Sequence, residues 1–251
     1  MGCFMLLDNR GRKFFVPDSK VAVRVEGLGV VDPGNFTPDD VGGPVLVAGK
    51  KFILFRPTLS DMMLSLERGP QIIMEKDASV IAHYMNLGCG SVVLEIGAGS
   101  GSMAIQLLHA VGAQGAVVTL DNRLEHLKVA SSNVSRFGLR ETWHPVVADG
   151  RMHVGSVFAD AACIDIPDPW NAISSCWHAL RPGGMLASYS PTVNQTEKTV
   201  ISAKAISFTH ELSFEVLMRR LDVSEGATRH SFEGPGHTGY ISVFRKVNAN
   251  K

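Results

Sequence analysis

The sequence predicts an α/β fold in which parallel strands alternate with helices, preceded by a small β-rich unit. The apolar run Val92–Ile96 leads directly into Gly97, Gly99 and Gly101, which is typical of a strand, a tight turn and a helix. Further β-rich runs follow, separated by segments with helical spacing of apolar residues, and this alternation indicates a mostly parallel sheet. The first 66 or so residues instead hold short β-rich runs divided by turn signals, which predicts a small curled sheet or barrel.

Turn signals and apolar runs place the expected elements along the chain. In 1–66, short strands are expected at Cys3–Leu7, Lys13–Val16, Val21–Val25, Pro44–Val47 and Lys51–Phe55. In 67–251, helices are expected at Lys76–Asn86, at 101–111 and after Asp121, and strands at 115–120, 144–148, 159–164 and 184–190. Two late strands, which could run antiparallel, are expected at Val216–Leu221 and Tyr240–Val247. We therefore expect a domain boundary after residue 66.

Composition narrows the class of protein. The chain has 251 residues, 45% of them hydrophobic and 19% charged, which is enough to bury a large core. Its four cysteines lack C-x-x-C spacing, so neither disulfides nor a metal site is expected. The N-terminal apolar run is too short for a signal peptide, which indicates a cytoplasmic protein without a membrane anchor. Because 24 basic residues balance 24 acidic ones, the total charge gives no support for a nucleic-acid partner, and any basic surface must be local.

The glycine spacing selects between cofactors. Dinucleotide sites use G-x-G-x-x-G, because a pyrophosphate must rest on the end of the following helix. Here the spacing is G-x-G-x-G, and Glu95 stands just before Gly97. A carboxylate at that point would repel a diphosphate and attract the ammonium of a methionyl group. The pattern therefore favours S-adenosylmethionine over NAD.

Acidic residues end the next three β-rich runs: Asp121, Asp149 and Asp165. In doubly wound sheets an acid at the end of the second strand accepts hydrogen bonds from ribose hydroxyls, which is the role expected of Asp121. Asp149 could reach the exocyclic amine of the cofactor's adenine, and Asp165 should face the methyl donor. Any one of these acids could instead be an ordinary helix N-cap, but their recurrence favours a binding site.

Prolines stiffen the loop that follows Asp165. The segment Asp165-Ile166-Pro167-Asp168-Pro169-Trp170 would hold a carboxylate and backbone carbonyls at fixed positions, as needed to orient an adenine or cytosine edge. The plain structural alternative is a turn with a capping Asp and a packed Trp.

Five segments give the sequence a resemblance to a known family. They are Arg68-Gly69-Pro70-Gln71-Ile72-Ile73 with Lys76-Asp77, the loop Glu95–Ser102, Asp165-Ile166-Pro167 with Pro169-Trp170, Tyr189–Gln195, and His237-Thr238-Gly239-Tyr240. Over nearly its whole length the chain resembles the tRNA (adenine-N1)-methyltransferases that act in the T-loop, including the catalytic subunit of the eukaryotic enzyme. The resemblance implies a Rossmann-like class I S-adenosylmethionine-dependent methyltransferase with a small N-terminal β domain, a tRNA substrate and a homotetramer.

The motifs and the resemblance together imply which residues form the site. Asp165 is the expected catalytic residue, acting at the substrate base. Cofactor binding is expected from Gln71, Glu95, Gly97, Gly99, Ser100, Gly101, Ser102, Met103, Asp121, His126, Asp149 and Asp165. Substrate binding is expected from Trp170, Tyr189, Asn194, Gln195, His237 and Tyr240. For the three aromatic residues burial in the core is the alternative, and Asn194 and Gln195 could instead cap the helix that starts there.

The expected chemistry follows from the reactants. Methylation at N1 of an adenine places positive charge on the purine, and a carboxylate hydrogen-bonded to the N6 amine would stabilise it without a covalent nucleophile. The resemblance implies a T-loop adenine at tRNA position 58 or 57, which must leave its stack to enter the site. Two other classes stay open: an S-adenosylmethionine-dependent methyltransferase of a small molecule or of protein isoaspartate, and a non-catalytic subunit that retains the fold.

Overall fold

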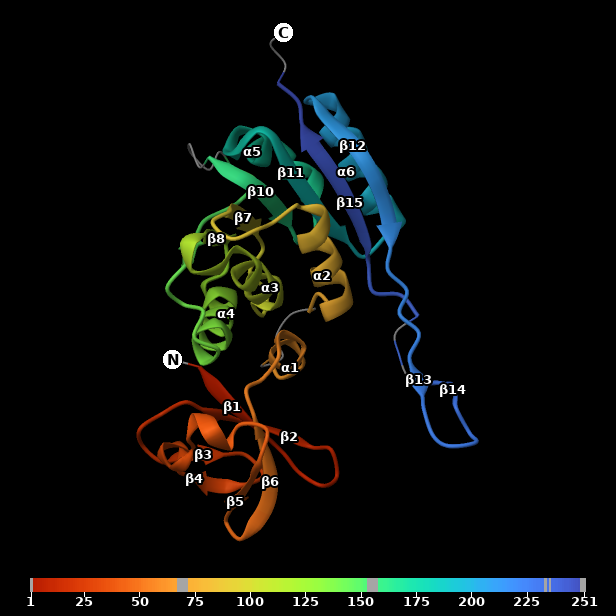
Figure 1. Cartoon of the computed structure of the whole chain (residues 1–251). Coiled ribbons are helices and arrows are strands. Elements are labelled where there is room, and N and C mark those ends of the chain that lie inside the picture. The colour runs from red at the N-terminus through yellow and green to blue at the C-terminus, as the bar shows by residue number, and fades with distance from the viewer. Residues whose placement is uncertain (1, 67–71, 153–157, 233, 235, 249–251) are drawn as a thin grey trace.

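The computed structural model contains two main sheets, of four and seven strands, connected through one short helix, α1 (Leu59–Leu64), and two further two-stranded pairs. It describes residues 2–66, 72–152, 158–232, 234 and 236–248. Figure 1 shows the N-terminal strands as a unit of their own below the larger α/β unit, with α1 between them. Among the described residues, no helix has the length and apolar composition needed to cross a bilayer.

The N-terminal β domain is built on an antiparallel sheet in the order β2-β1-β6-β5. Its strands are β1 (Cys3–Leu7), β2 (Lys13–Pro17), β5 (Pro44–Val47) and β6 (Lys50–Phe55). A hairpin, β3 (Val23–Val25) and β4 (Gly29–Val31), is followed by two 3-10 turns, η1 (Pro33–Asn35) and η2 (Pro38–Asp40). Val25 and Val31 of the hairpin share a buried cluster with Leu6 and Leu54, so this domain has a core of its own.

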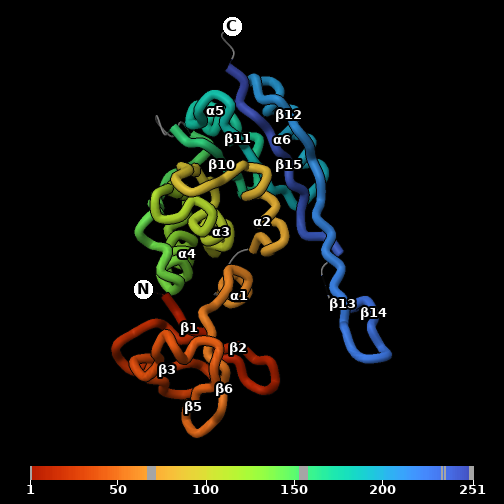
Figure 2. Tube along the Cα trace, in the orientation of Figure 1, coloured from red at the N-terminus to blue at the C-terminus, as the bar shows by residue number. Residues whose placement is uncertain are grey.

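The larger sheet has seven strands in the order β12-β15-β11-β10-β7-β8-β9. Five consecutive strands run parallel: β11 (Leu180–Ser190), β10 (Ala159–Ile164), β7 (Val92–Ile96), β8 (Ala116–Asp121) and β9 (Trp143–Val147). The last strand, β15 (Tyr240–Lys246), is antiparallel to β11 and to the edge strand β12 (Phe208–Glu215). A separate pair, β13 (Leu221–Asp222) and β14 (Arg229–His230), forms an arm that Figure 2 shows extending from the body.

Helices cover both faces of the large sheet. They are α2 (Glu75–Tyr84), α3 (Ser102–Val111), α4 (Leu124–Arg136), α5 (Ile173–Ala179) and α6 (Val193–Ala205), with 3-10 turns η3 (Gly112–Gln114) and η4 (Pro169–Asn171). Successive strand residues point to opposite faces. Val93 accordingly packs in one buried cluster with residues of α2, α3 and α4, whereas Leu94 packs in another with residues of α5 and α6. The predicted fold class, a mostly parallel α/β sheet with a small N-terminal β domain, is confirmed.

The two units pack against each other. Cys3 of β1 belongs to the buried cluster that contains α2, α3 and α4. Arg136, at the end of α4, donates a hydrogen bond to the carbonyl oxygen of Ser65 (3.0 Å), and its guanidinium carbon lies 5.2 Å from the ring centre of Phe15. The predicted boundary after residue 66 adjoins residues 67–71, which lie outside the described part of the chain, and it stays a prediction.

One predicted strand is wrong. The edge strand of the large sheet is Phe208–Glu215, not Val216–Leu221, of which 216–220 form neither helix nor strand. The true strand alternates apolar and polar residues because only one of its faces packs on the protein. The more apolar segment after it instead leads into the arm. Helix α1 and strand β4 were also not predicted.

Candidate active site

The glycine loop lies where the ends of β7, β8 and β10 meet. The Gly97 nitrogen donates to the Leu120 oxygen, and the Asp165 nitrogen donates to the Ile96 oxygen, both at 2.8 Å. Strand β7 has its successor β8 on one side and β10 on the other, which is the switch point where open α/β sheets bind ligands. At Gly97, φ is +99° and a Cβ would lie 2.1 Å from the Asp165 oxygen. Only glycine fits there.

Side chains behind the loop hold it in place. Asn133 of α4 donates its side-chain amide to the Ser100 oxygen (2.9 Å), and the Ser102 hydroxyl donates to the Ile73 oxygen (2.8 Å). Met103 is buried in the main core. These contacts place Ser102 and Met103 in the support of the loop.

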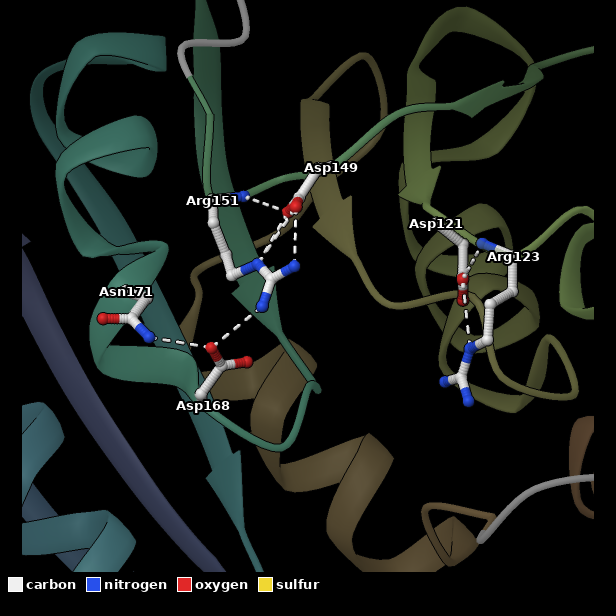
Figure 3. Close-up of polar contacts among 6 residues, drawn as sticks. All are labelled: Asp121, Arg123, Asp149, Arg151, Asp168 and Asn171. Atoms are coloured by element: carbon white, nitrogen blue, oxygen red, sulfur yellow. Dashed lines mark hydrogen bonds and ion pairs between the residues drawn. The ribbon is translucent and has the colours of Figure 1, made fainter.

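Asp121 organises the end of β8. Its Oδ2 accepts a hydrogen bond from the Ala98 nitrogen (3.0 Å) and lies 3.2 Å from Nδ1 of His126. Its Oδ1 accepts from the Arg123 nitrogen (2.9 Å), and Nε of Arg123 lies 3.8 Å away, as Figure 3 shows. These contacts fix the carboxylate while leaving acceptor capacity for a ligand, since a carboxylate offers about four lone-pair sites.

Arg151 connects the ends of β9 and β10 (Figure 3). Its Nε and Nη2 donate to the Asp149 carboxylate at 2.8 and 2.6 Å, and its Nη1 donates to Oδ2 of Asp168 at 3.1 Å. Asn171 donates to the same oxygen of Asp168 at 2.7 Å. Hydrogen bonds from Arg151 lower the pKa of Asp149 below its ordinary value, so this carboxylate is ionised at neutral pH.

Two adjoining cavities open at this edge of the sheet. The larger, of about 480 Å³, and the smaller, of about 220 Å³, share Asp121, Arg123, Ile166 and Pro167 in their walls. The larger cavity is also lined by Gly97, Asn122, Asp149, Gly150, Arg151 and Asp168. The smaller is also lined by Gly99, His126, Asp165, Tyr189, Pro191 and Gln195. The arrangement suits two ligands side by side, with a carboxylate in the shared wall.

Asp165 faces the smaller cavity. No hydrogen bond to its carboxylate comes from the described residues, although its backbone is fixed to β7. Burial, and after it the negative charge of Asp121, raise the pKa of Asp165 to about 7. A half-buried carboxyl group with unused acceptor capacity and a shifted pKa is typical of a functional position.

Glu95 lies beneath the glycine loop. Its Oε2 accepts a hydrogen bond from the Thr119 hydroxyl (2.6 Å), which in turn accepts one from the Trp143 indole (2.6 Å). Its Oε1 is buried and has no partner among the described residues. Burial is the main cause that raises the pKa of Glu95 to about 8. The described walls of the two cavities do not include Glu95, so its expected contact with an ammonium group stays a prediction.

Two of the expected substrate residues line the smaller cavity. Tyr189 is buried, with its hydroxyl 3.4 Å from Oδ2 of Asp77. Gln195 donates its side-chain amide to the Pro167 oxygen (2.8 Å). The N-cap of α6 is Thr192, whose hydroxyl accepts from the Gln195 nitrogen. Asn194 therefore does not cap the helix, whereas Gln195 takes part in the cap, because its Oε1 accepts a hydrogen bond from the Thr192 hydroxyl (2.6 Å).

The remaining expected substrate residues lie outside the described walls of the smaller cavity. His237 places Nδ1 2.5 Å from Oε1 of Glu215 and Nε2 2.9 Å from the Pro191 oxygen, and these contacts raise the pKa of His237. Its ring centre lies 4.8 Å from that of Tyr240. Trp170 is half-buried beneath the ammonium of Lys198. Gln71, expected at the cofactor, lies outside the described residues.

Sequence reasoning missed three polar residues of the larger cavity, Asn122, Arg123 and Arg151. Each follows a strand-end acid by one or two positions, and this proximity is the signal that could have found them. The sequence analysis also assigned no role to Lys76. The Lys76 ammonium donates to Asp77 (2.7 Å), to the Val216 oxygen (2.7 Å) and to the Thr238 hydroxyl (2.6 Å), and so connects α2 with the segment before β15.

Comparison with known proteins decides the family. The sequence profile described as the GCD14 subunit of the tRNA methyltransferase complex matches residues 51–238. The tRNA (adenine(58)-N(1))-methyltransferase TrmI of Thermus thermophilus is 30% identical, over 99% of this chain and 98% of its own. The chain belongs to this family. The predicted family and its enzyme class, tRNA (adenine-N1)-methyltransferase, are confirmed.

Other relatives match the methyltransferase over nearly its full length. The Methanocaldococcus jannaschii enzyme named for adenines 57 and 58 is 29% identical, over 96% of this chain and 94% of its own. The crystal structure of an S-adenosylmethionine-dependent O-methyltransferase from Thermotoga maritima superposes with a TM-score of 0.86 at 30% identity, over 100% of this chain and 94% of that one. That of the Aquifex aeolicus tRNA methyltransferase TrmI gives 0.78 at 28% identity, over 98% and 97%. The predicted class I S-adenosylmethionine-dependent fold, with its N-terminal β domain, is thereby confirmed.

Proposed function

We propose that the protein transfers a methyl group from S-adenosylmethionine to N1 of an adenine in the T-loop of tRNA, at position 58, 57 or both. The observation that carries this proposal is the Asp165 carboxylate. It stands without a described hydrogen-bond donor in the smaller cavity, next to a larger cavity at the switch point of the sheet. The family of the chain supports the same reaction and a tRNA substrate.

The larger cavity fits S-adenosylmethionine, which supplies an electrophilic methyl group when bound. Asp121 offers acceptor lone pairs to ribose hydroxyls, and Asp149, kept ionised by Arg151, offers them to the exocyclic amine of an adenine. At Gly97 the missing Cβ makes room for the Asp165 carbonyl oxygen, so the glycine loop can lie against the end of β10 beside the larger cavity. The volume of about 480 Å³ lies in the range of small-molecule sites.

The other expected cofactor residues support this pocket from two directions. Gly99 and His126 stand at its border with the smaller cavity. Glu95, Ser100, Gly101, Ser102 and Met103 act from the loop and from behind it, as hydrogen-bonded and packed support.

Asp165 is the residue that we assign to the substrate base. Its carboxylate accepts a hydrogen bond from the N6 amine and stabilises the positive charge that develops when N1 is alkylated. Because the N1 lone pair attacks directly, the chain need supply only position and charge. The base reaches the smaller cavity by leaving its stack, and Tyr189 and Gln195 line that cavity to receive it.

The remaining substrate contacts that we expect come from residues outside the described walls of this cavity. His237 bonds to the carbonyl oxygen of Pro191, which is itself part of the wall, and the Tyr240 ring contacts that of His237 at a tilt of 44°. Asn194 is exposed on the first turn of α6, and Trp170 lies on η4. We assign these four residues to the RNA around the flipped base.

The test is methyl transfer to defined RNA. Purified chain is incubated with labelled S-adenosylmethionine and unmodified tRNA, and the nucleosides are separated. We expect 1-methyladenosine, its loss when the T-loop adenines are replaced, and a rate about 10² to 10³ lower for Asp165→Asn with unchanged binding of S-adenosylhomocysteine. Label on a ribose oxygen, on another base, or on a small molecule or isoaspartyl peptide in preference to tRNA would contradict the proposal.

We also infer that the protein self-associates through the arm that carries β13 and β14. Its segment holds large exposed apolar side chains, among them Leu217 (74% exposed), Val223 (78%) and Phe232 (90%). Exposed apolar groups of this size mark interaction surfaces, and Figure 2 shows the arm projecting from the body. The test is the molar mass in solution: the double variant Leu217→Ser, Phe232→Ser should dissociate the expected tetramer, whereas wild type already at monomer mass would contradict the inference.

A further inference from the structure

A third cavity, with a polar lining, lies in the N-terminal β domain, remote in sequence from the two cavities of the candidate active site. It measures about 670 Å³, and its polar wall holds Arg10, Arg12, Lys50 and Lys51 with a single acid, Asp8. We call these four basic residues the basic cleft. The chain as a whole has no formal net charge, so such a concentration of one sign is local.

The strand order brings the basic cleft together. Leu7, at the end of β1, pairs with Lys13 at the start of β2 and with Ile53 of β6. The β1–β2 turn and the β5–β6 turn therefore project from the same end of the sheet, with Arg10 and Arg12 on one and Lys50 and Lys51 at the other. In Figure 1 the β5–β6 turn lies at the bottom of the view, on the side of the N-terminal domain away from the large sheet.

Most of the positive charge in the basic cleft is uncompensated. The Asp8 carboxylate is occupied by contacts within its own turn. It accepts hydrogen bonds from the backbone nitrogens of Arg10 and Arg12 (both 2.9 Å) and from the side-chain Nε of Arg12 (2.7 Å). Within the described part of the chain, the side chains of Arg10, Lys50 and Lys51 are exposed and form no ion pair. A further cavity in the same domain shares Gly27 and Leu28 with the wall of the basic cleft. It adds one cation, Arg24, and one anion, Glu26, whose charges offset each other.

We propose that the basic cleft binds the phosphate backbone of the tRNA, outside the T-loop. This inference depends on the proposed function, because it takes the same RNA as its ligand. Exposed cations on two hairpin turns suit a polyanion, since release of condensed counterions drives such binding without fixed side-chain geometry. Backbone contacts of this kind position an RNA and carry no sequence information. The cleft therefore contributes to affinity for tRNA and not to choice of the methylated base.

The experiment measures tRNA binding by the full-length protein against salt. The cleft variant Arg10→Glu, Lys50→Glu, Lys51→Glu is compared with a control of equal charge change, Lys20→Glu, Lys128→Glu, Lys204→Glu, whose residues are exposed and lie outside the cleft. The logarithm of the tRNA association constant falls linearly with the logarithm of the salt concentration. We expect the magnitude of this slope to be smaller in the cleft variant by about 2 to 3, one unit for each lost contact. Its KM for tRNA should rise at least 10-fold, with unchanged kcat and unchanged affinity for S-adenosylmethionine.

The outcomes separate this inference from the proposed function. If both triple variants shift the slope and the KM equally, the effect is one of net charge and the basic cleft is not a binding surface. In a different outcome, the wild-type protein forms no 1-methyladenosine but binds tRNA in a salt-dependent way, and the cleft variant loses this binding. The proposed reaction is then wrong, whereas the basic cleft remains a binding surface for tRNA. Thermal unfolding of each variant checks that the N-terminal domain remains folded.

Discussion

Gly239 leaves room for the ring of Tyr189: a Cβ at position 239 would lie 2.4 Å from Cζ of that tyrosine. The Tyr189 hydroxyl lies near Asp77, and Lys76 bonds to both Asp77 and Thr238, the neighbour of Gly239. Helix α2, strand β11 and the segment before β15 therefore meet around one aromatic ring in the wall of the smaller cavity.

We expect Gly239→Ala to displace this ring. The methyl group cannot fit, so either Tyr189 or the start of β15 must move, and overpacking of this kind costs about 1–3 kcal/mol. The kcat/KM for tRNA should fall at least 10-fold while affinity for S-adenosylmethionine stays unchanged. Gly236→Ala is the matched control, because a Cβ there meets nothing within 4 Å. Equal activity of the two variants would show that the Tyr189 ring does not have to stay in place.

The pH dependence of the reaction should report Asp165. Burial, and then the charge of Asp121, raise the pKa of Asp165 to about 7, and only the ionised form stabilises the positively charged purine. The kcat/KM for S-adenosylmethionine, which reports groups of the free enzyme, should therefore rise tenfold per pH unit below about 7 and level off above it. The kcat profile should break at lower pH, because the bound sulfonium favours the carboxylate. A residual Asp165→Asn activity with the same break would assign the titration to another group.

The framework of the site could be predicted because it depends on local signals. The run into Gly97 and the acids Asp121, Asp149 and Asp165 each combine a strand with a residue at its end, and parallel strands bring such ends to one edge. The edge strand Phe208–Glu215 was missed for the converse reason. Its alternation is that of a half-exposed strand, and the more apolar segment after it, Val216–Leu221, is not stabilised by any sheet neighbour at 216–220.

The contacts between residues of the site could not be predicted from the sequence. Some join residues that are distant in sequence, and others depend on which way a side chain points. The contact of Gly239 with Tyr189 spans fifty positions and depends on β15 being antiparallel to β11. Glu95 lies within β7, one residue before its end, and Asp165 directly follows β10, yet of these two only Asp165 lines one of the two cavities. Oε1 of Glu95 is left without a partner because the Thr119 hydroxyl, which Trp143 holds in place, donates to Oε2. The sequence pattern does not contain these packing contacts.

Glu95 should make stability depend on pH. Its pKa is raised by burial from 4.5 to about 8, so between these values the folded protein holds a proton that the unfolded chain has lost. The free energy of unfolding contributed by this group therefore falls as pH rises through that window. Glu95→Gln keeps an acceptor for the Thr119 hydroxyl but cannot ionise. The melting temperature of this variant minus that of wild type should therefore increase from pH 5 to pH 8. Glu125→Gln, exposed on α4, is the control. A constant difference across this range would mean that Glu95 is already ionised in the folded protein.

Arg151 should control affinity for the cofactor through Asp149. In Arg151→Ala the Asp149 carboxylate loses the hydrogen bonds that orient it and that lower its pKa. We expect the Kd for S-adenosylhomocysteine, measured by calorimetry, to rise about 5- to 10-fold, roughly the net contribution of one ordinary hydrogen bond. The melting temperature should stay close to that of wild type, because the pair is solvent-accessible. Arg181→Ala is the matched control, since Arg181 forms a similar exposed pair with Asp160 that lines neither cavity. Equal cofactor affinity of the two variants would remove Arg151 and its contact with Asp149 from the cofactor site.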